Sequence, residues 1–313
     1  MLGLLMASQR LTDHEMREAR FAALADTSFV RNGPTAGALG GTWSALREIL
    51  GQREMLGLLV RRDLKARYKD SSLGFVWSLV RPLTQLVIYY VVIGRFLGAA
   101  RGTPDFAIYV FTGLTAYALF SEIVSGGTSS IVGNAGLIKK IYLPREIFPL
   151  ASVGSAMFNF LIQFGILVIA TLILMKFPWH VEILYLIPSF LIIVIFGTAL
   201  AILLSAVNVY LRDIQYLVEV GLMILMWASP IVYPWSTVQN AIGNGILLDI
   251  YTDNPITLAV LGFQKAMWIS GESVPSPDWL LPRMLIAIAI GLIMLVGFQR
   301  VFARLQGNFA QEL

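Results

Sequence analysis

The side chains that carry most enzyme chemistry are scarce in this sequence. There is no cysteine, and the two histidines, His14 and His180, are far apart in the chain. These counts exclude thiolate nucleophiles and sulfur-ligated clusters, and they disfavour a multi-histidine metal centre. No Gly-Lys dipeptide occurs, so there is no G-x-x-x-x-G-K-[ST] phosphate loop, and G-x-S-x-G and H-E-x-x-H are absent as well. We therefore expect a protein that is not an enzyme; if it uses ATP, another chain must hydrolyse it.

Two acidic residues, Glu122 and Glu219, lie within apolar segments. A carboxylate at membrane depth is costly and often functional. For Glu219 two interpretations stand side by side: a structural ion pair with Arg212 or another neighbour, or a functional group. Two isolated carboxylates are too few to form a proton relay.

The composition indicates the kind of fold in which these residues lie. Of 313 residues, 57% are hydrophobic and 13% are charged, against roughly 25% charged in a soluble domain. The mean hydropathy is +0.73. So much apolar surface does not fit inside one soluble core. We therefore predict an all-α polytopic membrane protein.

Six segments are apolar over about the 20 residues that a membrane-spanning helix needs. They are Phe75–Leu97, Phe106–Val124, Phe148–Met175, Ile183–Val209, Ile214–Tyr233 and Leu281–Phe302. Together they predict a six-helix transmembrane domain over residues 71–313. Residues 1–42 are rich in polar and small residues and are expected to form a flexible cytosolic tail.

The basic residues predict the orientation of the six spans. Of the 23 Lys and Arg residues, 18 fall on the side that includes the N-terminus. The other side has 5, which are Arg95, Arg101, Lys176, Lys265 and Arg283. Because Lys and Arg are enriched in cytosolic loops, both termini are predicted to be cytosolic.

Residues 43–70, ahead of the first span, are predicted to form an amphipathic interface helix. Its apolar arc on a helical wheel holds Trp43, Leu46, Ile49, Leu50, Leu56, Val60 and Leu64. Arg53 intrudes on this arc, and Leu58 and Leu59 fall on the polar side. Such a helix lies at the membrane surface with its basic side toward anionic head groups. Packing on a soluble domain is the alternative, for which little soluble mass is available.

Two connections differ from simple loops. The outer connection, residues 235–280, contains apolar pieces too short to span, Ile246–Tyr251 and Ile256–Ile269. Pieces of this length predict short re-entrant gate helices between spans five and six. The inner connection, Ser125–Ile147, begins with small residues and ends in a basic stretch around Lys139.

Several motifs resemble those of the type-2 ABC exporter permeases, which move O-antigens, capsules, teichoic acids and related glycans. They are the run Arg61–Trp77, Asn134–Lys140 followed by Leu143-Pro144, Arg212-Asp213, Ser229-Pro230, Asn254-Pro255 and Phe309-Ala310. The motifs occur in the family's order and cover most of the chain from about Leu46 onward. Gln264-Lys265 departs from the family, which often has an arginine in that helix, so the role of this position is open.

The resemblance implies a half-transporter in the bacterial cytoplasmic membrane. Two permease copies would pair with two ATP-binding cassette ATPase subunits, which bind ATP and Mg, so this chain would hold no cofactor or metal. A glycan on a polyprenyl diphosphate would cross from the inner to the outer face between the two copies, and no nucleic acid is involved. The coupling helix that docks on the ATPase would include Leu137, Lys139, Lys140, Tyr142, Pro144 and Arg145. Its basic residues are also explained as topogenic charges, and the two roles are compatible.

Further candidate residues lie near the first two spans. Four basic residues are suited to draw a lipid diphosphate from the inner leaflet: Lys65, Arg67, Lys69 and Arg81. Anchoring to anionic phospholipids is the alternative. The candidate channel-lining residues are Tyr89, Tyr90, Tyr117, Phe120 and Glu219. Tyrosines near helix ends are also explained as part of the interfacial aromatic belt.

Two other functional classes compete with this interpretation. A membrane-embedded transferase acting on polyprenyl-linked sugars would need clustered acidic residues for a divalent cation. The outer acids, Asp249, Asp253, Glu272 and Asp278, are scattered in the sequence. An ion-coupled secondary transporter would need more buried ionisable groups and repeated halves, which the sequence does not show.

Overall fold

The computed structural model describes residues 47–68, 76–96, 98, 102–140, 143–271 and 274–313. The predicted tail and the first residues of the predicted interface helix lie outside these ranges. Every regular element within them is a helix, as predicted. In chain order the elements are α3 (Arg53–Tyr68), α4 (Val76–Ile88), the π-helix η1 (Tyr89–Phe96), α5 (Phe106–Gly133), α6 (Ala135–Ile138), α7 (Ile147–Ile173), the 3-10 helix η3 (Val181–Tyr185), α8 (Leu186–Tyr210), α9 (Ile214–Trp227), α10 (Trp235–Ile242), α11 (Ile246–Thr252), α12 (Pro255–Met267), the 3-10 helix η4 (Ile269–Gly271), α13 (Leu280–Leu305), the 3-10 helix η5 (Gln306–Asn308) and α14 (Phe309–Glu312).

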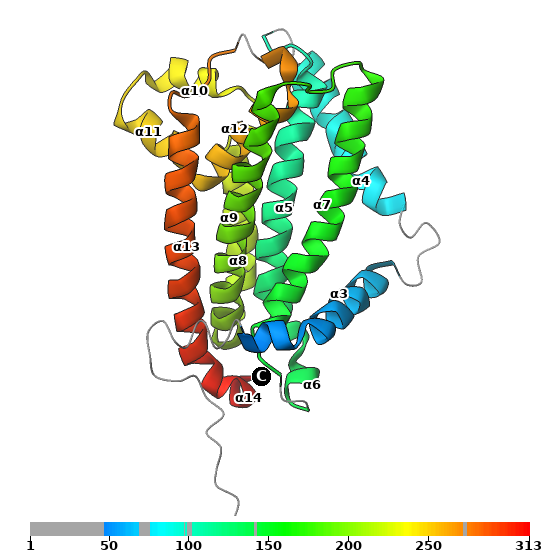
Figure 1. Ribbon diagram of the computed structural model, residues 1–313, viewed down its shortest axis with the longest axis vertical. Helices are drawn as coiled ribbons and strands as arrows, with labels where there is room; N and C mark the ends of the chain where they lie inside the picture. The colour runs from blue at the N-terminus through cyan, green and yellow to red at the C-terminus, as the bar shows by residue number, and fades with distance from the viewer. Residues whose placement is uncertain (1–46, 69–75, 97, 99–101, 141–142, 272–273) are drawn as a thin grey trace, which may run out of the picture. The chain divides into compact units, whose positions relative to one another are not determined.

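Four of the described helical segments are long and apolar enough to cross a membrane. They are α5, α7, η3 with α8, and α13 with η5, which correspond to the second, third, fourth and sixth predicted spans. Figure 1 shows α5, α7, α8 and α13 running along one another. The first predicted span is helical over residues 76–96, and the fifth is α9 with 14 residues. At 1.5 Å per residue α9 is about 21 Å long, shorter than the roughly 30 Å of hydrocarbon. The count of six spans therefore stays a prediction.

Helix α5 lies at the centre of the bundle because small residues let other helices approach it closely. In its most apolar stretch 78% of the residues are buried, against 22% in α13. A Cβ added at Gly127 would lie 2.9 Å from Cα of Ala201 in α8, so these two backbones are in direct contact. The prediction that this span ends at Val124 is wrong, since α5 continues to Gly133. The small-residue run after Ser125 is a helix-packing surface instead of a loop.

Helix α3 packs against α7 through a face that the helical wheel identified in part, since Leu56 and Val60 of its apolar arc pack against the buried cluster at this end. Leu59, placed on the polar side by the wheel, is 4% exposed and is the most deeply buried residue described in this helix. Val60 packs against Gly154 of α7, where an added Cβ would lie 2.8 Å from Val60 Cγ2. The helical turn at residues 47–51 is separated from α3 by a turn residue, Gln52, so one continuous wheel over both segments misplaces Leu59.

Short helices close each end of the bundle. At one end, here called the α3 end, lie α3, α6 and α14; at the other, the α12 end, lie α10, α11 and α12 (Figure 1). Helix α12 begins at Pro255, with the Asn254 side chain accepting a hydrogen bond from the Ile256 backbone N–H at 2.9 Å. This cap and the proline at the first helical position explain the Asn254-Pro255 motif locally. Helices α11 and α12 bend by 72° and match the two predicted short apolar pieces, while their role as gates stays a prediction.

Candidate functional site

The basic stretch predicted to couple to an ATPase forms a short loop, residues 134–146, between α5 and α7. We call it the α6 loop. Lys139 and Lys140 are exposed at its tip, and Pro144 is buried at its base. Leu137 packs at the edge of an apolar cluster that joins this loop to α3, α8 and α13. Tyr142 lies outside the described residues.

Two side-chain contacts hold the α6 loop from opposite sides. The amide oxygen of Asn134, at the start of the loop, accepts a hydrogen bond from Arg62 of α3 at 2.7 Å, and its amide N–H donates to the Ser130 carbonyl. At the other end of the loop, the Arg145 guanidinium lies over the ring of Phe309, 5.5 Å from its centroid. The loop is therefore fastened both to the N-terminal helix α3 and to the C-terminal helix α14.

Phe309 is fully buried although it lies four residues before Leu313, the last residue of the sequence. Its ring makes edge contacts with Tyr210 and Phe302, at centroid distances of 6.1 Å and 5.6 Å. The hydroxyl of Tyr210 donates to the carbonyl of Leu305 at 2.7 Å, which ties α8 to the end of α13. Phe309, the first residue of the Phe309-Ala310 motif, thus has a structural role that its sequence position alone does not reveal.

Glu146 is a buried carboxylate at the point where the α6 loop enters α7. Its residue is 4% exposed. Burial raises the pKa of Glu146, against the lowering effect of hydrogen bonds from its own backbone N–H and from Gln299. A carboxylate at this position was not singled out from the sequence, because its burial depends on α13 and other distant elements.

The residues predicted to bind a lipid diphosphate are only partly described. Lys65 is exposed on α3, and Arg67 lies 3.9 Å from Glu122 of α5. The other carboxylate oxygen of Glu122 accepts a hydrogen bond from Asn159 of α7 at 2.8 Å. Lys69 lies outside the described residues, and only the backbone of Arg81, in α4, is described.

The predicted channel residues differ from one another in burial. Tyr117 and Phe120 are buried in α5, and the Tyr117 hydroxyl donates to the carbonyl of Leu222 in α9. Tyr89 and Tyr90 are half-buried in η1. Glu219 is exposed on α9, and in the described part of the chain it forms no ion pair, with Arg212 or otherwise. Their role in a channel stays a prediction.

Two of the outer acidic residues are brought together at the α12 end. Asp249 of α11 and Asp253, the residue that follows α11, each accept a hydrogen bond from Arg283 of α13 at 2.7 Å. The pair therefore joins α11 to α13 through one shared guanidinium. This arrangement neutralises part of the acidic charge that a cation-dependent transferase would need.

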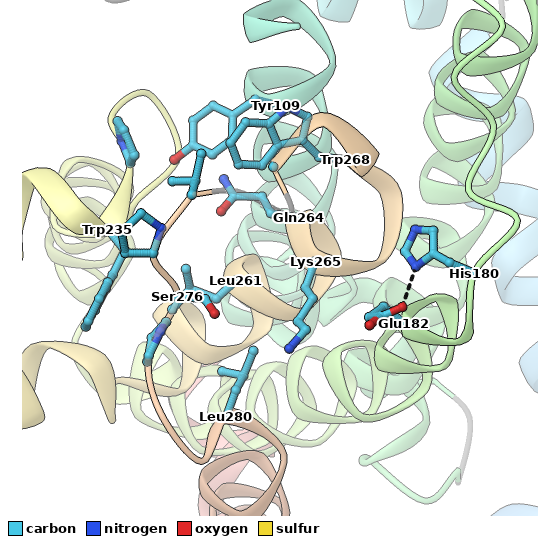
Figure 2. A pocket seen from close by; sticks show the side chains of 15 residues that line it. Tyr109, His180, Glu182, Trp235, Leu261, Gln264, Lys265, Trp268, Ser276 and Leu280 are labelled. Carbon is cyan, nitrogen blue, oxygen red and sulfur yellow. Dashed lines mark hydrogen bonds and ion pairs between the residues drawn. The ribbon is translucent and has the colours of Figure 1, made fainter. Parts of the chain in front are cut away.

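A pocket of about 340 Å³ lies at the α12 end and was not predicted from the sequence. Figure 2 shows Lys265 of α12 between Trp235 on one side and the His180–Glu182 pair on the other. The Nδ1 atom of His180 lies 2.8 Å from the Glu182 carboxylate. The Lys265 ammonium lies over the ring of Tyr185, 4.7 Å from its centroid. Segments far apart in the sequence build this pocket, so no local motif could have indicated it.

These features define a multi-pass α-helical membrane protein whose two ends differ, with a basic loop at one end and a polar pocket at the other. The chain belongs to the ABC-2 type transporter family, whose profile matches residues 54–268. This confirms the predicted membership of the type-2 ABC exporter permeases.

Three curated relatives indicate the kind of permease to which the chain is similar. It is 28% identical to an O-antigen export system permease of Myxococcus xanthus, over 86% of this chain and 98% of that protein. It is 27% identical to an O-antigen export system permease of Klebsiella pneumoniae, over 83% of this chain and 95% of that protein. A polysialic acid transport protein of Escherichia coli is 21% identical, over 60% of this chain and 73% of that protein.

Proposed function

We propose that this chain is the transmembrane subunit of an ATP-driven exporter that moves a polyprenyl-diphosphate-linked glycan from the inner to the outer face of the bacterial cytoplasmic membrane. The observation that carries the proposal is the α6 loop. It exposes Lys139 and Lys140, and both of its ends continue directly into long apolar helices. A short rigid loop of this kind converts movement of a docked partner into movement of α5 and α7.

The partner is a separate ATPase subunit that binds ATP and Mg. Family membership supports such a partner, and the exposed positive charge of the α6 loop suits an acidic docking surface. The predicted cytosolic side of the membrane is the α3 end, since 18 of the 23 basic residues were assigned there. Both termini are then cytosolic.

The functional unit contains two copies of the permease. Nearly all residues of α9 are exposed or half-exposed, and Leu222, at 8% exposed, is its one buried residue. The exposed face includes apolar side chains such as Leu217, Val220 and Met223, but also the carboxylate of Glu219. A carboxylate facing lipid is costly, whereas one facing a wet path between two copies is tolerated. We infer that α9 faces a second copy and that Glu219, Tyr89 and Tyr90 lie along the path of the substrate.

Lys65 and Arg67 contribute to binding the lipid diphosphate at the inner leaflet. Arg67 lies near the C-terminal end of α3, and its ion pair with Glu122 is long and about half exposed. A diphosphate offers this guanidinium a stronger, charge-assisted partner than a carboxylate at 3.9 Å. The hydrogen bond from Asn159 to Glu122 is then expected to keep Glu122 beside Arg67 until the lipid binds.

Co-purification tests this proposal. Expressed with its cognate ATPase, the chain should form a complex of two permeases and two ATPases that exports lipid-linked glycan when ATP is supplied. Charge reversal at Lys139, Lys140 and Arg145 should abolish docking or coupled hydrolysis, whereas Arg304→Glu, an exposed cation at the same end, should preserve both. Normal assembly and coupling in the triple variant would refute the docking assignment. Export of the glycan by the chain without any ATPase would refute the mechanism.

A further inference from the structure

The pocket at the α12 end has a composition that points to a particular ligand. We propose that it binds one sugar ring of the exported glycan, with Lys265 and Glu182 as hydrogen-bonding groups. The inference rests on the proposed function, which supplies the glycan. It assigns a site that is separate from both the α6 loop and the exposed face of α9.

The volume of the pocket suits a single ring. Pockets that hold small ligands measure roughly 300 to 1,000 Å³. At about 340 Å³, this pocket lies near the lower limit. It can hold one ring, while the rest of a glycan chain would continue outside it.

The polar groups of the pocket match adjacent sugar hydroxyls, each of which is both a donor and an acceptor. Lys265 provides donors and forms no ion pair within the described residues. Glu182 provides acceptor oxygens, and its side chain is 44% exposed although it is bonded to His180. An acyl chain would remove water from these groups without replacing their hydrogen bonds. A simple inorganic anion would be repelled by the negative charge of the Glu182 carboxylate.

Three aromatic rings of the lining are held in fixed positions by hydrogen bonds. The indole N–H of Trp235 donates to the hydroxyl of Thr252 at 2.9 Å, and that of Trp268 donates to the carbonyl of Pro104 at 2.7 Å. The Tyr109 hydroxyl lies 2.7 Å from the backbone carbonyl oxygens of Pro230 and Tyr233 and donates its one proton to either of them. None of these partners lines the pocket. The rings therefore offer their apolar surface to the cavity, as the C–H groups of a sugar require.

The position of the pocket suits a glycan that leaves the membrane. Trp179 and Trp279, next in sequence to the lining residues His180 and Leu280, are 85% and 77% exposed. Exposed tryptophans at the ends of spanning helices mark the membrane–water boundary. The pocket then lies at head-group depth on the side opposite the α6 loop, where the first sugars of the exported glycan emerge.

The test measures binding of free sugars to the full complex with its ATPase in nanodiscs of phosphatidylethanolamine and phosphatidylglycerol. Glucose, galactose, mannose, rhamnose, N-acetylglucosamine and glucuronate are each examined by saturation-transfer NMR. At least one sugar should bind. Lys265→Gln should weaken its binding roughly tenfold, as expected for loss of a hydrogen bond from a charged donor. Ser276→Trp, which fills the pocket from an exposed wall residue, should abolish binding, and Asn240→Trp, on an exposed face of α10 outside the pocket, should leave it unchanged.

Each outcome decides the inference. Absence of binding by all six sugars, or binding that survives both Lys265→Gln and Ser276→Trp, overturns it. Binding of glycerol phosphate in the pocket without binding of any sugar also overturns it, in favour of a lipid head-group site. A complex that binds sugar in the pocket but does not export glycan contradicts the proposed function, and leaves only the assignment of the pocket as a sugar site standing. A complex that exports glycan while no sugar binds in the pocket supports the proposed function and overturns this inference.

Discussion

The guanidinium of Arg145 lies 5.5 Å from the ring centroid of Phe309, so the α6 loop rests on the last helix of the chain. Arg145 comes just before α7, and Phe309 is the first residue of α14. The two residues are 164 positions apart, so the contact joins the predicted docking loop to the end of α13. Movement of the loop is therefore expected to reach α13 as well as α5 and α7.

Phe309→Leu tests this connection while largely preserving apolar volume. It removes a cation–π contact worth about 0.5 to 1 kcal/mol at an exposed site, and two aromatic edge contacts worth roughly 0.5 to 1.5 kcal/mol each. We expect the free energy of unfolding to fall by about 1.5 to 4 kcal/mol, and the ratio of glycan exported to ATP hydrolysed to fall in the assembled complex. Thermal unfolding and coupled transport assays provide the two measurements. Gln311→Ala, at an exposed neighbouring position, is the control, and an unchanged ratio in Phe309→Leu would contradict the prediction.

The second attachment of the α6 loop, between Arg62 and Asn134, gives a separate prediction. Arg62→Gln removes the charge-assisted hydrogen bond at 2.7 Å. Because the Arg62 side chain is 47% exposed, the expected loss of stability is below about 1 kcal/mol. The expected effect on function is larger: the complex still forms, but export per ATP falls. Arg61→Gln, one position away and exposed, should behave like wild type, and equal coupling in the two variants would show that the contact is not used.

The sequence predicted the helical elements because long apolar segments depend on composition and length. The spans expected at Phe148–Met175 and Leu281–Phe302 correspond closely to α7 and α13. The end of α5 was misplaced because glycine and serine near Gly127 are typical of loops in water, while in a membrane bundle they allow helices to pack closely. In the same way, the wheel for α3 could not account for the break at Gln52.

The candidate sites were less predictable because their residues come from distant parts of the chain. The basic residues of the α6 loop were found because Lys139 and Lys140 are adjacent and follow a recognisable motif. The partners that hold the loop, Arg62 and Phe309, lie far from it in sequence, and no local pattern links them. The pocket around Lys265 depends on the placement of η3 and α10 beside α12, which the sequence does not specify.

The close contact of Gly127 with Ala201 predicts a strong effect of one methyl group. Gly127→Ala places a Cβ 2.9 Å from the Cα of Ala201, so α5 and α8 must separate. Overpacking of this kind typically costs about 1 to 3 kcal/mol. The matched control is Gly165→Ala in α7, where an added Cβ meets nothing within 4 Å and a helix gains roughly 0.5 to 1 kcal/mol. Thermal unfolding should show opposite shifts, and Ala201→Gly should partly restore stability in the Gly127→Ala background. Equal stability of the two alanine variants would refute the close packing.

The buried carboxylate of Glu146 predicts a pH dependence of stability. Burial raises its pKa in the folded chain above the ordinary value of 4.5. Because the folded state then holds the proton more tightly than the unfolded state, the contribution of Glu146 to stability is greatest below pH 4.5 and declines as pH rises through the raised pKa. Glu146→Gln keeps a neutral hydrogen-bonding group at every pH. We therefore expect this variant to match wild type at low pH and to become the more stable of the two as pH rises, which thermal unfolding at a series of pH values would measure. A constant difference in melting temperature across the series would show that Glu146 has the same proton affinity in the folded and unfolded states.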